Sequence, residues 1–424
     1  MKNKSLTIII LMFIFIISSS HIASQTLFDC EGVLPPTMTI GDTGYVRDTG
    51  ANNVRDNAGL DAQVVGSLQP DEQFTVLSEP QCVEGYIWYE VENDAISGWT
   101  AESGNGIYWL LPLSNIEPND FSEINLIHEF MCDDGELPYA FDFSVASDKL
   151  VVSCGWDDRT VSIYALPSGE LLNQTEMNTR TVHFVLNDTQ LLVQTDDTLQ
   201  LLDVETFEPT LSLALDRTRY THLSFDRRIF FRVEGDTAYT YDVETLTELA
   251  TFTHLSGESI SYVVTDVYNS HLLLANDYQT SSLFTLDANL NIISSEEIPF
   301  SFEAIAPDMT IAIEARCTFA NHGCQSAEVI WYDLSTLQQI HSTASDYADL
   351  RHITFTPDSR EFVLGGCRLQ TFDTVSRVNI PITDINIACY EPYLISPNWN
   401  YLIVQAYGID DEASDSLKLY EFIG

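Results

Sequence analysis

Basic residues are scarce in this chain. It has 18 lysines and arginines against 63 aspartates and glutamates, which gives a formal net charge of −45 at pH 7. Nucleic acids and anionic membrane surfaces repel such a protein, because they carry the same sign of charge. The composition therefore excludes both as partners. Two interpretations of the acidity stay open: a surface that attracts cations or basic proteins, and a solvated surface without a partner.

Sequence motifs of catalysis and metal binding are missing. The chain contains no His-Glu-x-x-His, no Gly-x-Ser-x-Gly, no phosphate-binding glycine loop and no EF-hand loop. It also contains no Cys-x-x-Cys pair, which structural zinc sites commonly use. In so acidic a chain, two acids close in sequence say little about acid–base chemistry. We therefore expect no enzymatic activity and no cofactor, with Ca²⁺ as the one exception considered below.

Apolar runs long enough to cross a membrane are missing at the N-terminus. The run at Leu6–Ile17 has 12 residues, fewer than the roughly 20 of a membrane-spanning helix. Lysines at positions 2 and 4 precede it, and small polar residues follow it. This order is typical of a secretory signal peptide, with an uncleaved signal anchor as the alternative. We predict a leader at residues 1–24 and a protein that is extracellular or in the cell envelope, without membrane insertion after cleavage.

A short phrase recurs along the chain, in which an apolar residue is followed in most copies by an aspartate and a polar turn. Its clearest copy, Tyr241–Leu246, reads Tyr-Asp-Val-Glu-Thr-Leu. Seven copies place equivalent residues at 165, 203, 242, 287, 333, 373 and 421, at steps of 38 to 48 residues. A period of about 40 to 45 residues is typical of four-stranded propeller blades. The repeat therefore predicts an all-β fold with seven blades, starting near residues 138, 181, 220, 259, 302, 350 and 389.

These repeats resemble those of WD40-type propellers over residues 124–424. Pairs such as Leu202-Asp203 and Tyr332-Asp333 stand where that family has Trp-Asp, whereas the family's Gly-His dipeptide is missing. The resemblance implies a seven-bladed β-propeller. The last unit stops at its third strand, Leu417–Phe422, and the strand at Ile124–Phe130 has no blade of its own. We expect these two strands to pair, because closing the ring removes exposed strand edges.

Residues 30–113 have the pattern of a small β-barrel, with short strands between Gly-, Pro- and Asn-containing turns. They resemble the bacterial SH3-like domain. The matching motifs are Asn53-Val54-Arg55, Val65-Gly66, Phe74–Leu77, Gly85–Val91 and Gly98–Glu102. The resemblance implies a non-catalytic module that often holds cell-wall or peptide ligands. The polar residues 114–123 are the expected linker to the propeller.

Aromatic residues are the candidate ligand contacts of the barrel, because a planar ring offers a large contact face. In a barrel of this size aromatics also form the core, and we expect Trp99 to be a core residue. Strand alternation must place some of the others outside. The candidates are Tyr86, Trp88, Tyr89, Tyr108 and Trp109.

Eight cysteines in a secreted chain favour disulfides over a metal site, although eight allow 105 pairings. The blade assignment narrows the choice, because it places some cysteines at second-strand ends and others in connections on the same face of the propeller. We predict the pairs Cys30–Cys82, Cys132–Cys154, Cys317–Cys324 and Cys367–Cys389.

Three histidines, His183, His222 and His352, hold nearly equivalent positions at the first strands of their units. First strands line the central channel of a propeller, so these imidazoles are candidates for a divalent metal site or a pH sensor. The alternative is three hydrogen-bonded channel histidines without a ligand. Uneven spacing of their blades around the ring favours that alternative.

Acidic residues gather in the turns between second and third strands, most clearly at Asp157, Asp158, Asp196 and Asp197. By topology these turns share one face of the propeller with the histidines. A ring of carboxylates there is a candidate site for Ca²⁺ or for a basic peptide. The alternative is that aspartate is simply a good turn residue.

Two functional hypotheses follow from these patterns. The first is a secreted, non-enzymatic binding or scaffold protein, with the propeller as an interaction platform for protein or ligand and the SH3-like module as the cell-wall or peptide-binding element. The second is an extracellular hydrolase with its site in the propeller channel. The fold does not separate them, because propellers host both. The missing nucleophile motifs favour the first, and a spacer role for the SH3-like domain is a third option.

Overall fold

We describe a computed structural model of the chain. It describes residues 30, 33–47, 50–104, 107–113, 124–132, 138–154, 160–215, 220–275, 280–320, 323–345, 353–356, 359–365, 370–374, 377, 379–381, 393–406 and 416–422. Every element among them is a β-strand. No helix in these ranges could cross a membrane. The predicted leader and the linker at residues 114–123 lie outside the described residues.

The N-terminal part is a small barrel in which strand β1 (Thr43–Val46) pairs with strands distant in sequence. Its sheet has the order β10-β1-β4-β6-β7-β2-β3, with β5 against β6 and a separate β8–β9 hairpin. Alternate residues such as Val54, Val76 and Ile87 are fully buried inside it. The other strands are β2 (Asn52–Arg55), β3 (Val64–Leu68), β4 (Gln73–Val76), β5 (Gln81–Val83), β6 (Tyr86–Glu92), β7 (Ser97–Ala101), β8 (Ser103–Gly104), β9 (Ile107–Tyr108) and β10 (Leu110–Pro112).

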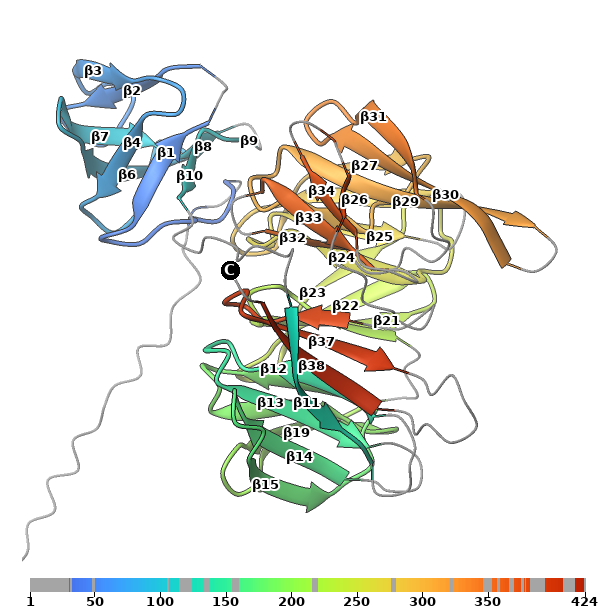
Figure 1. Ribbon diagram of the computed structural model, residues 1–424. Helices are drawn as coiled ribbons and strands as arrows, with labels where there is room; N and C mark the ends of the chain where they lie inside the picture. Colours follow the sequence, from blue (N-terminus) through green and yellow to red (C-terminus); the bar gives the residue numbers. More distant parts are fainter. Residues whose placement is uncertain are drawn as a thin grey trace, which may run out of the picture.

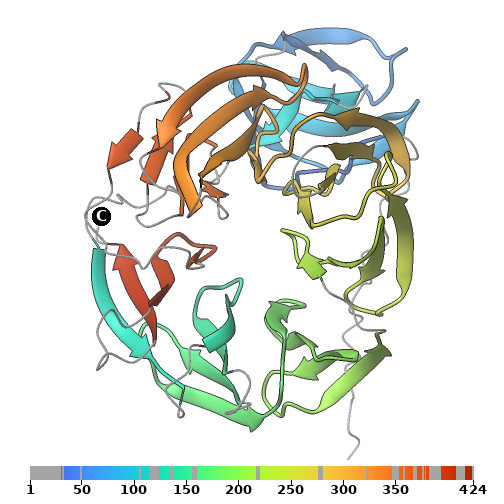
Figure 2. The same ribbon diagram turned by 90° about the vertical axis from the view of Figure 1, so that its right-hand side faces the viewer.

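Seven four-stranded blades form a propeller around a central axis, as the repeat predicts (Figure 2). Blades 1 to 3 are β12 (Pro138–Phe143), β13 (Lys149–Cys154), β14 (Thr160–Ala165), β15 (Leu171–Glu176); β16 (Thr181–Val185), β17 (Gln190–Gln194), β18 (Thr198–Asp203), β19 (Pro209–Ala214); β20 (Tyr220–Leu223), β21 (Ile229–Glu234), β22 (Thr237–Asp242) and β23 (Glu248–Thr253).

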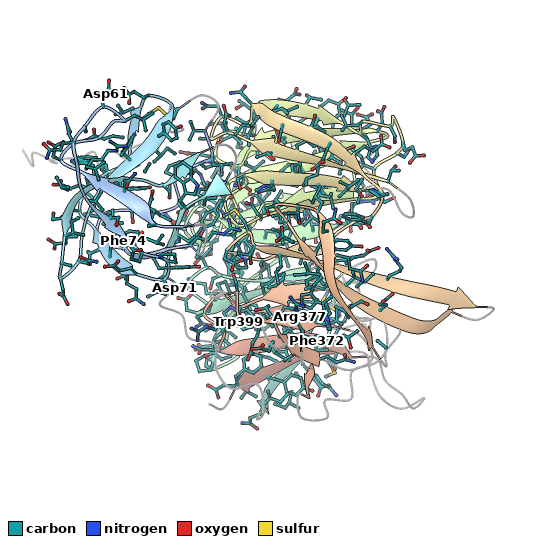
Figure 3. The ribbon with its side chains drawn as sticks, turned by 90° about the horizontal axis from the view of Figure 1, so that it is seen from above. Asp61, Asp71, Phe74, Phe372, Arg377 and Trp399 are labelled. Atoms are coloured by element: carbon teal, nitrogen blue, oxygen red, sulfur yellow. A yellow bond between two sulfur atoms is a disulfide. The ribbon has the colours of Figure 1, made fainter. Side chains whose placement is uncertain are left out.

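Blades 4 to 6 follow the same order, and in blade 5 the β29–β30 hairpin extends away from the barrel (Figures 1 and 3). Their strands are β24 (Tyr262–Thr265), β25 (His271–Ala275), β26 (Ser281–Leu286), β27 (Ile292–Ile298); β28 (Ala304–Ile305), β29 (Ile311–Ala320), β30 (Gly323–Asp333), β31 (Gln338–Ser345); β32 (Ile353–Phe355), β33 (Glu361–Leu364), β34 (Gln370–Asp373) and β35 (Asn379–Pro381).

Blade 7 combines strands from both ends of the propeller sequence. Its strands are β36 (Tyr393–Ile395), β37 (Tyr401–Ala406), β38 (Ser416–Phe422) and β11 (Ile124–Phe130). The outermost strand β11 runs antiparallel to β38, from Ile124 opposite Phe422 to Phe130 opposite Leu417. Figure 2 shows this strand beside the red C-terminal strands. The pairing expected from the sequence is therefore present in the structure.

The recurring aspartate has a structural role at the end of the third strand. Oδ1 of Asp242 accepts the backbone N–H and the hydroxyl of Thr245, both at 2.7 Å. Asp203 and Asp333 bond Thr206 and Thr336 in the same way, and the bonds from Thr206 lower the pKa of Asp203. A residue with positive φ follows each turn, for example Leu246 at 52°. The phrase thus encodes the turn that leads to the outer strand of a blade.

Turns between first and second strands connect neighbouring blades. Each of six such turns holds a non-glycine residue with φ between 54° and 60°. Side chains from these turns bond to the preceding blade in two clear examples: Ser359 Oγ accepts the N–H of Asp308 at 2.9 Å, and Arg227 donates to the Phe184 carbonyl at 2.9 Å. The six residues with positive φ are Ser147, Arg227, Asn269, Met309, Ser359 and Trp399.

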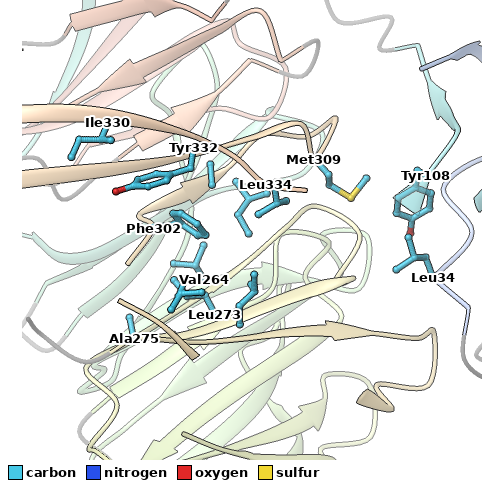
Figure 4. Packing of buried hydrophobic residues seen from close by; sticks show 14 of the residues in the cluster. Leu34, Tyr108, Val264, Leu273, Ala275, Phe302, Met309, Ile330, Tyr332 and Leu334 are labelled. Atoms are coloured by element: carbon cyan, nitrogen blue, oxygen red, sulfur yellow. The ribbon is translucent and has the colours of Figure 1, made fainter. Parts of the chain in front are cut away.

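The barrel packs on this turn face beside blades 4 and 5 (Figures 1 and 4). Leu34, Tyr108 and Leu111 share one buried cluster with propeller residues that include Met309. The Tyr108 and Tyr268 ring centroids are 5.7 Å apart. Arg47 also donates to the Met309 carbonyl at 3.3 Å. The two domains therefore share one cluster of buried apolar residues.

Two of the four predicted disulfides are present, Cys30–Cys82 and Cys132–Cys154. The first ties the N-terminal segment to β5, and the second joins the connection before blade 1 to β13. Cys367 and Cys389, and the side chains of Cys317 and Cys324, lie outside the described residues. The other two pairings stay predictions.

Candidate ligand-binding site

A cavity of about 290 Å³ opens on the outer face of the barrel. One wall is aromatic, and a second wall comes from β2 and the residues that flank it. We call this cavity the groove. Its lining residues are Gly50, Ala51, Asn52, Asn53, Arg55, Leu60, Tyr86, Trp88, Ala101 and Trp109.

Strand alternation on β6 explains the aromatic wall. Tyr86 and Trp88 point outward into the groove, while Ile87 and Tyr89 point into the barrel core. The rings of Tyr86 and Trp109 stack with centroids 6.1 Å apart, and Tyr86 meets Trp88 edge-on at 6.4 Å. Trp88 is itself buried and donates its indole N–H to the Val83 carbonyl at 3.1 Å. The wall is therefore held in place before any ligand binds, which lowers the entropy cost of binding.

Gly104 lets the two outer rings meet. A Cβ atom at this position would lie 2.5 Å from the Trp109 ring and 2.8 Å from the Tyr86 ring. We predict that Gly104→Ala pushes these rings apart, destabilises the barrel by about 1–3 kcal/mol and shifts tryptophan emission to the red. Fluorescence and thermal unfolding of the purified variant test this, and an unchanged spectrum would contradict it.

The second wall supplies hydrogen-bonding groups in fixed positions. The Asn52 side-chain amide donates to the Ala101 carbonyl at 2.7 Å. Arg55 Nη1 donates to the carbonyls of Leu60 and Ala62 at 2.8 and 2.7 Å. No acidic residue is among the lining residues, although acids outnumber bases more than threefold in the chain. The groove thus combines a stacking surface with amide and guanidinium groups, a combination suited to peptide or sugar ligands.

Two of the predicted aromatic contacts do not line the groove. Tyr89 is fully buried, and its hydroxyl donates to the Met38 carbonyl at 2.8 Å. Tyr108 is buried between barrel and propeller, with its hydroxyl donating to the Pro35 carbonyl at 2.6 Å. The expectation for these two is corrected, because one faces the core and the other is covered by the propeller. Trp99, expected in the core, is half-buried.

The channel histidines contact neighbouring protein groups. His183 Nδ1 lies 3.6 Å from Oδ2 of Asp142. The Asp142 carboxylate also accepts two bonds from Arg227, to Oδ2 at 2.8 Å and to Oδ1 at 3.0 Å. Desolvation, followed by the nearby His183, lowers the pKa of His222 to about 4. The two imidazoles therefore lie close together with His222 neutral near pH 7. His352 lies outside the described residues.

The acidic turns make contacts within their own blades. The Asp196 carboxylate forms an exposed ion pair with Arg180 at 2.6 Å. Asp197 accepts a bond from the Thr195 hydroxyl at 3.3 Å. Asp157 and Asp158 lie outside the described residues. Within the described ranges no three His, Cys, Asp or Glu side chains gather as a metal site, so the Ca²⁺ expectation gains no support from them.

Sequence reasoning missed the second wall of the groove. Asn53-Val54-Arg55 is a motif of the domain, and its outward side chains also line the groove. The alternation around the buried Val54 was the available signal, because it sends Asn53 and Arg55 to the outer face. No comparable sequence pattern indicates that Asn52 and Leu60 line the groove.

Comparison with known proteins agrees with this geometry. Residues 49–104 match the family model of the bacterial SH3 domain. Every lining residue except Trp109 falls within the matched range. No match to the chain was found among curated proteins. The barrel that carries the groove is thus a bacterial SH3 domain, joined here to a seven-bladed β-propeller.

Proposed function

We propose that this is a secreted, non-enzymatic binding protein whose SH3 domain holds a cell-wall or peptide ligand in the groove. The observation that carries the proposal is the groove itself, which is lined both by stacked Tyr86 and Trp109 and by the fixed polar groups of Asn52 and Arg55. The propeller is the platform that presents this domain and binds further proteins. The predicted leader and the disulfides support a location outside the cytoplasm.

The alternative, a hydrolase, has one cluster to consider among the described residues. Ser270 Oγ donates to Asp266 Oδ2 and lies 3.0 Å from His271 Nδ1. Asp266 Oδ2 approaches that same nitrogen, at 3.3 Å. In a catalytic triad the imidazole lies between serine and aspartate and uses both nitrogens. Here both partners meet Nδ1, and Ser270 is fully buried. This arrangement supports the non-enzymatic proposal.

Removal of the aromatic wall tests the proposal. We expect the wild-type protein to co-sediment with purified peptidoglycan and Trp109→Ala to lose at least about tenfold in affinity, because stacking area at a buried contact is lost. Tyr86→Ala should behave in the same way. Phe225→Ala is the matched control, since Phe225 is a 70% exposed aromatic on the propeller. A wild-type protein that stays in the supernatant, or a folded Trp109→Ala that sediments normally, would overturn the proposal.

A further inference from the structure

One short stretch of chain serves both the groove and the joint between the two domains. Trp109 lines the groove, and the preceding residue, Tyr108, packs into the apolar cluster shared with the propeller (Figure 4). Neighbouring residues of an extended segment point to opposite sides. A displacement of this segment therefore changes the groove wall and the interdomain contact together.

Glu102 holds this stretch in place. Its backbone carbonyl accepts the N–H groups of Trp109 and Leu110 at 2.7 and 3.1 Å. Its side-chain Oε1 accepts the backbone N–H and the hydroxyl of Thr37, at 2.9 and 2.6 Å. Thr37 belongs to the N-terminal segment that also contains Leu34 and Pro35. One residue thus connects the groove wall, the N-terminal segment and the domain joint.

The other oxygen of this carboxyl group has no partner. Glu102 is fully buried, and Oε2 makes no hydrogen bond within the described part of the chain. No basic group is among those that act on Glu102. An ionised carboxylate in such a place is costly, because burial removes its water and nothing replaces the hydrogen bonds that Oε2 loses.

The groups around Glu102 are acids and phenols. Its charge raises the pKa of Tyr89 in β6, of Tyr108 in β9 and of Tyr268 in blade 4. Asp266 raises the pKa of two of these, Tyr108 and Tyr268, which lie at the joint between the domains. Farther out, Asp42 and Glu79 lie near Tyr89, while Tyr45 and Asp308 lie near Tyr268. Arg47 lies beside Asp308. No basic group in the described ranges compensates a negative charge on Glu102 itself, so burial is what opposes its ionisation.

We propose that Glu102 is a protonation switch which couples the ligand groove to the propeller: the neutral acid keeps the SH3 domain docked, and the ionised form loosens the joint and the Trp109 wall. The docked state holds the proton, and opening admits water to Oε2. Only the statement about ligand binding rests on the proposed function; the docking statement stands without it.

The direction and range of the pH effect follow from the carboxyl group. Desolvation raises the pKa of Glu102 from 4.5 to about 8, although the bonds from Thr37 oppose this rise. The lower value applies to the open form and the higher value to the docked form. At a pH between these two pKa values the docked protein binds a proton that the open form lacks, so docking is strongest at low pH and weakens as pH rises. From about pH 7 to about pH 9 the equilibrium constant for opening, the ratio of open to docked protein, should increase about tenfold. Few other groups titrate in that interval, because ordinary carboxyls and imidazoles have already lost their protons.

Hydrogen–deuterium exchange of the full chain measures this opening directly. The informative segments are the β24–β25 turn at residues 266–270 and residues 107–112, with rates corrected for intrinsic exchange. In the wild type we expect protection of both segments to fall about tenfold over the stated interval. In Glu102→Gln, which keeps the shape and the Oε1 acceptor, protection should not change with pH. Glu90→Gln, on the outer face of β6, removes the same charge elsewhere on the barrel and should retain the wild-type response.

Each outcome decides one part of the inference. If exchange protection depends on pH equally in the wild type and in Glu102→Gln, or in neither of them, the proposed switch is overturned. Co-sedimentation with peptidoglycan at the same two pH values then tests the coupling, with weaker binding at the higher pH expected for wild type and Glu90→Gln alone. A wild type that fails to sediment at both pH values would reject the proposed function, while the exchange data would still decide the docking statement.

Discussion

Replacement of Ile124–Phe130 by a glycine–serine segment of equal length is expected to lower the free energy of unfolding by about 5 kcal/mol or more. The change removes β11 and leaves the edge of β38 without its partner. It also uncovers the cluster in which Phe130 packs on Leu417 and Leu419. Retaining the length of the segment keeps the linker to the barrel intact, so the effect reports on strand pairing.

Point variants on the same strand separate packing from chain length. Phe130 is 7% exposed, and its ring centroid lies 4.6 Å from that of Tyr164. Phe130→Ala should cost about 2–4 kcal/mol, whereas Leu126→Ala, at a 46% exposed position, should cost less than about 0.5 kcal/mol. Urea unfolding followed by circular dichroism measures all three variants. An unchanged unfolding midpoint in the glycine–serine variant would rule out a stabilising role for this strand.

Asp142→Ala is the second large effect that we expect, at about 3–5 kcal/mol of stability. Asp142 is 4% exposed and accepts the backbone N–H of Phe184 at 3.0 Å. It also accepts two bonds from Arg227, which reaches it from the first turn of blade 3. The substitution leaves the largely buried guanidinium without its counter-charge. Three blades therefore depend on one carboxylate.

A double variant separates the cost of leaving a buried charge unpaired from the net contribution of the ion pair to stability. Replacing both partners, in Asp142→Leu with Arg227→Met, removes the unpaired charge and should recover most of the lost stability. A thermodynamic cycle over the two single variants and the double variant measures the coupling by chemical denaturation. Purely additive losses would show that the Asp142–Arg227 pair contributes no coupling energy. The exposed pair Arg180–Asp196 is the control, and Asp196→Ala should change stability by less than about 1 kcal/mol.

The blades were predictable because each is built from contacts local in sequence. Hairpins connect neighbouring strands, and the aspartate–threonine turn after the third strand recurs in blades 2, 3 and 5. Asp242 with Thr245 shows both the motif and its cause. The barrel was predictable for a different reason, since ordered motifs such as Gly98–Glu102 resemble a known family. Even the pairing of the first and last propeller strands followed from counting strands per unit.

Sequence patterns alone thus predicted the all-β fold, the seven blades, the barrel and two of the disulfides. Which side chains meet across long sequence distances became visible only in the folded protein. Alternation alone does not reveal that the propeller covers Tyr108 while Trp109 remains in the groove. Nor does a lone glutamate such as Glu102, one of 63 acids, show in sequence that it is buried without a counter-charge. Period and turn chemistry are local properties of the chain, whereas burial depends on which distant surfaces the fold brings together.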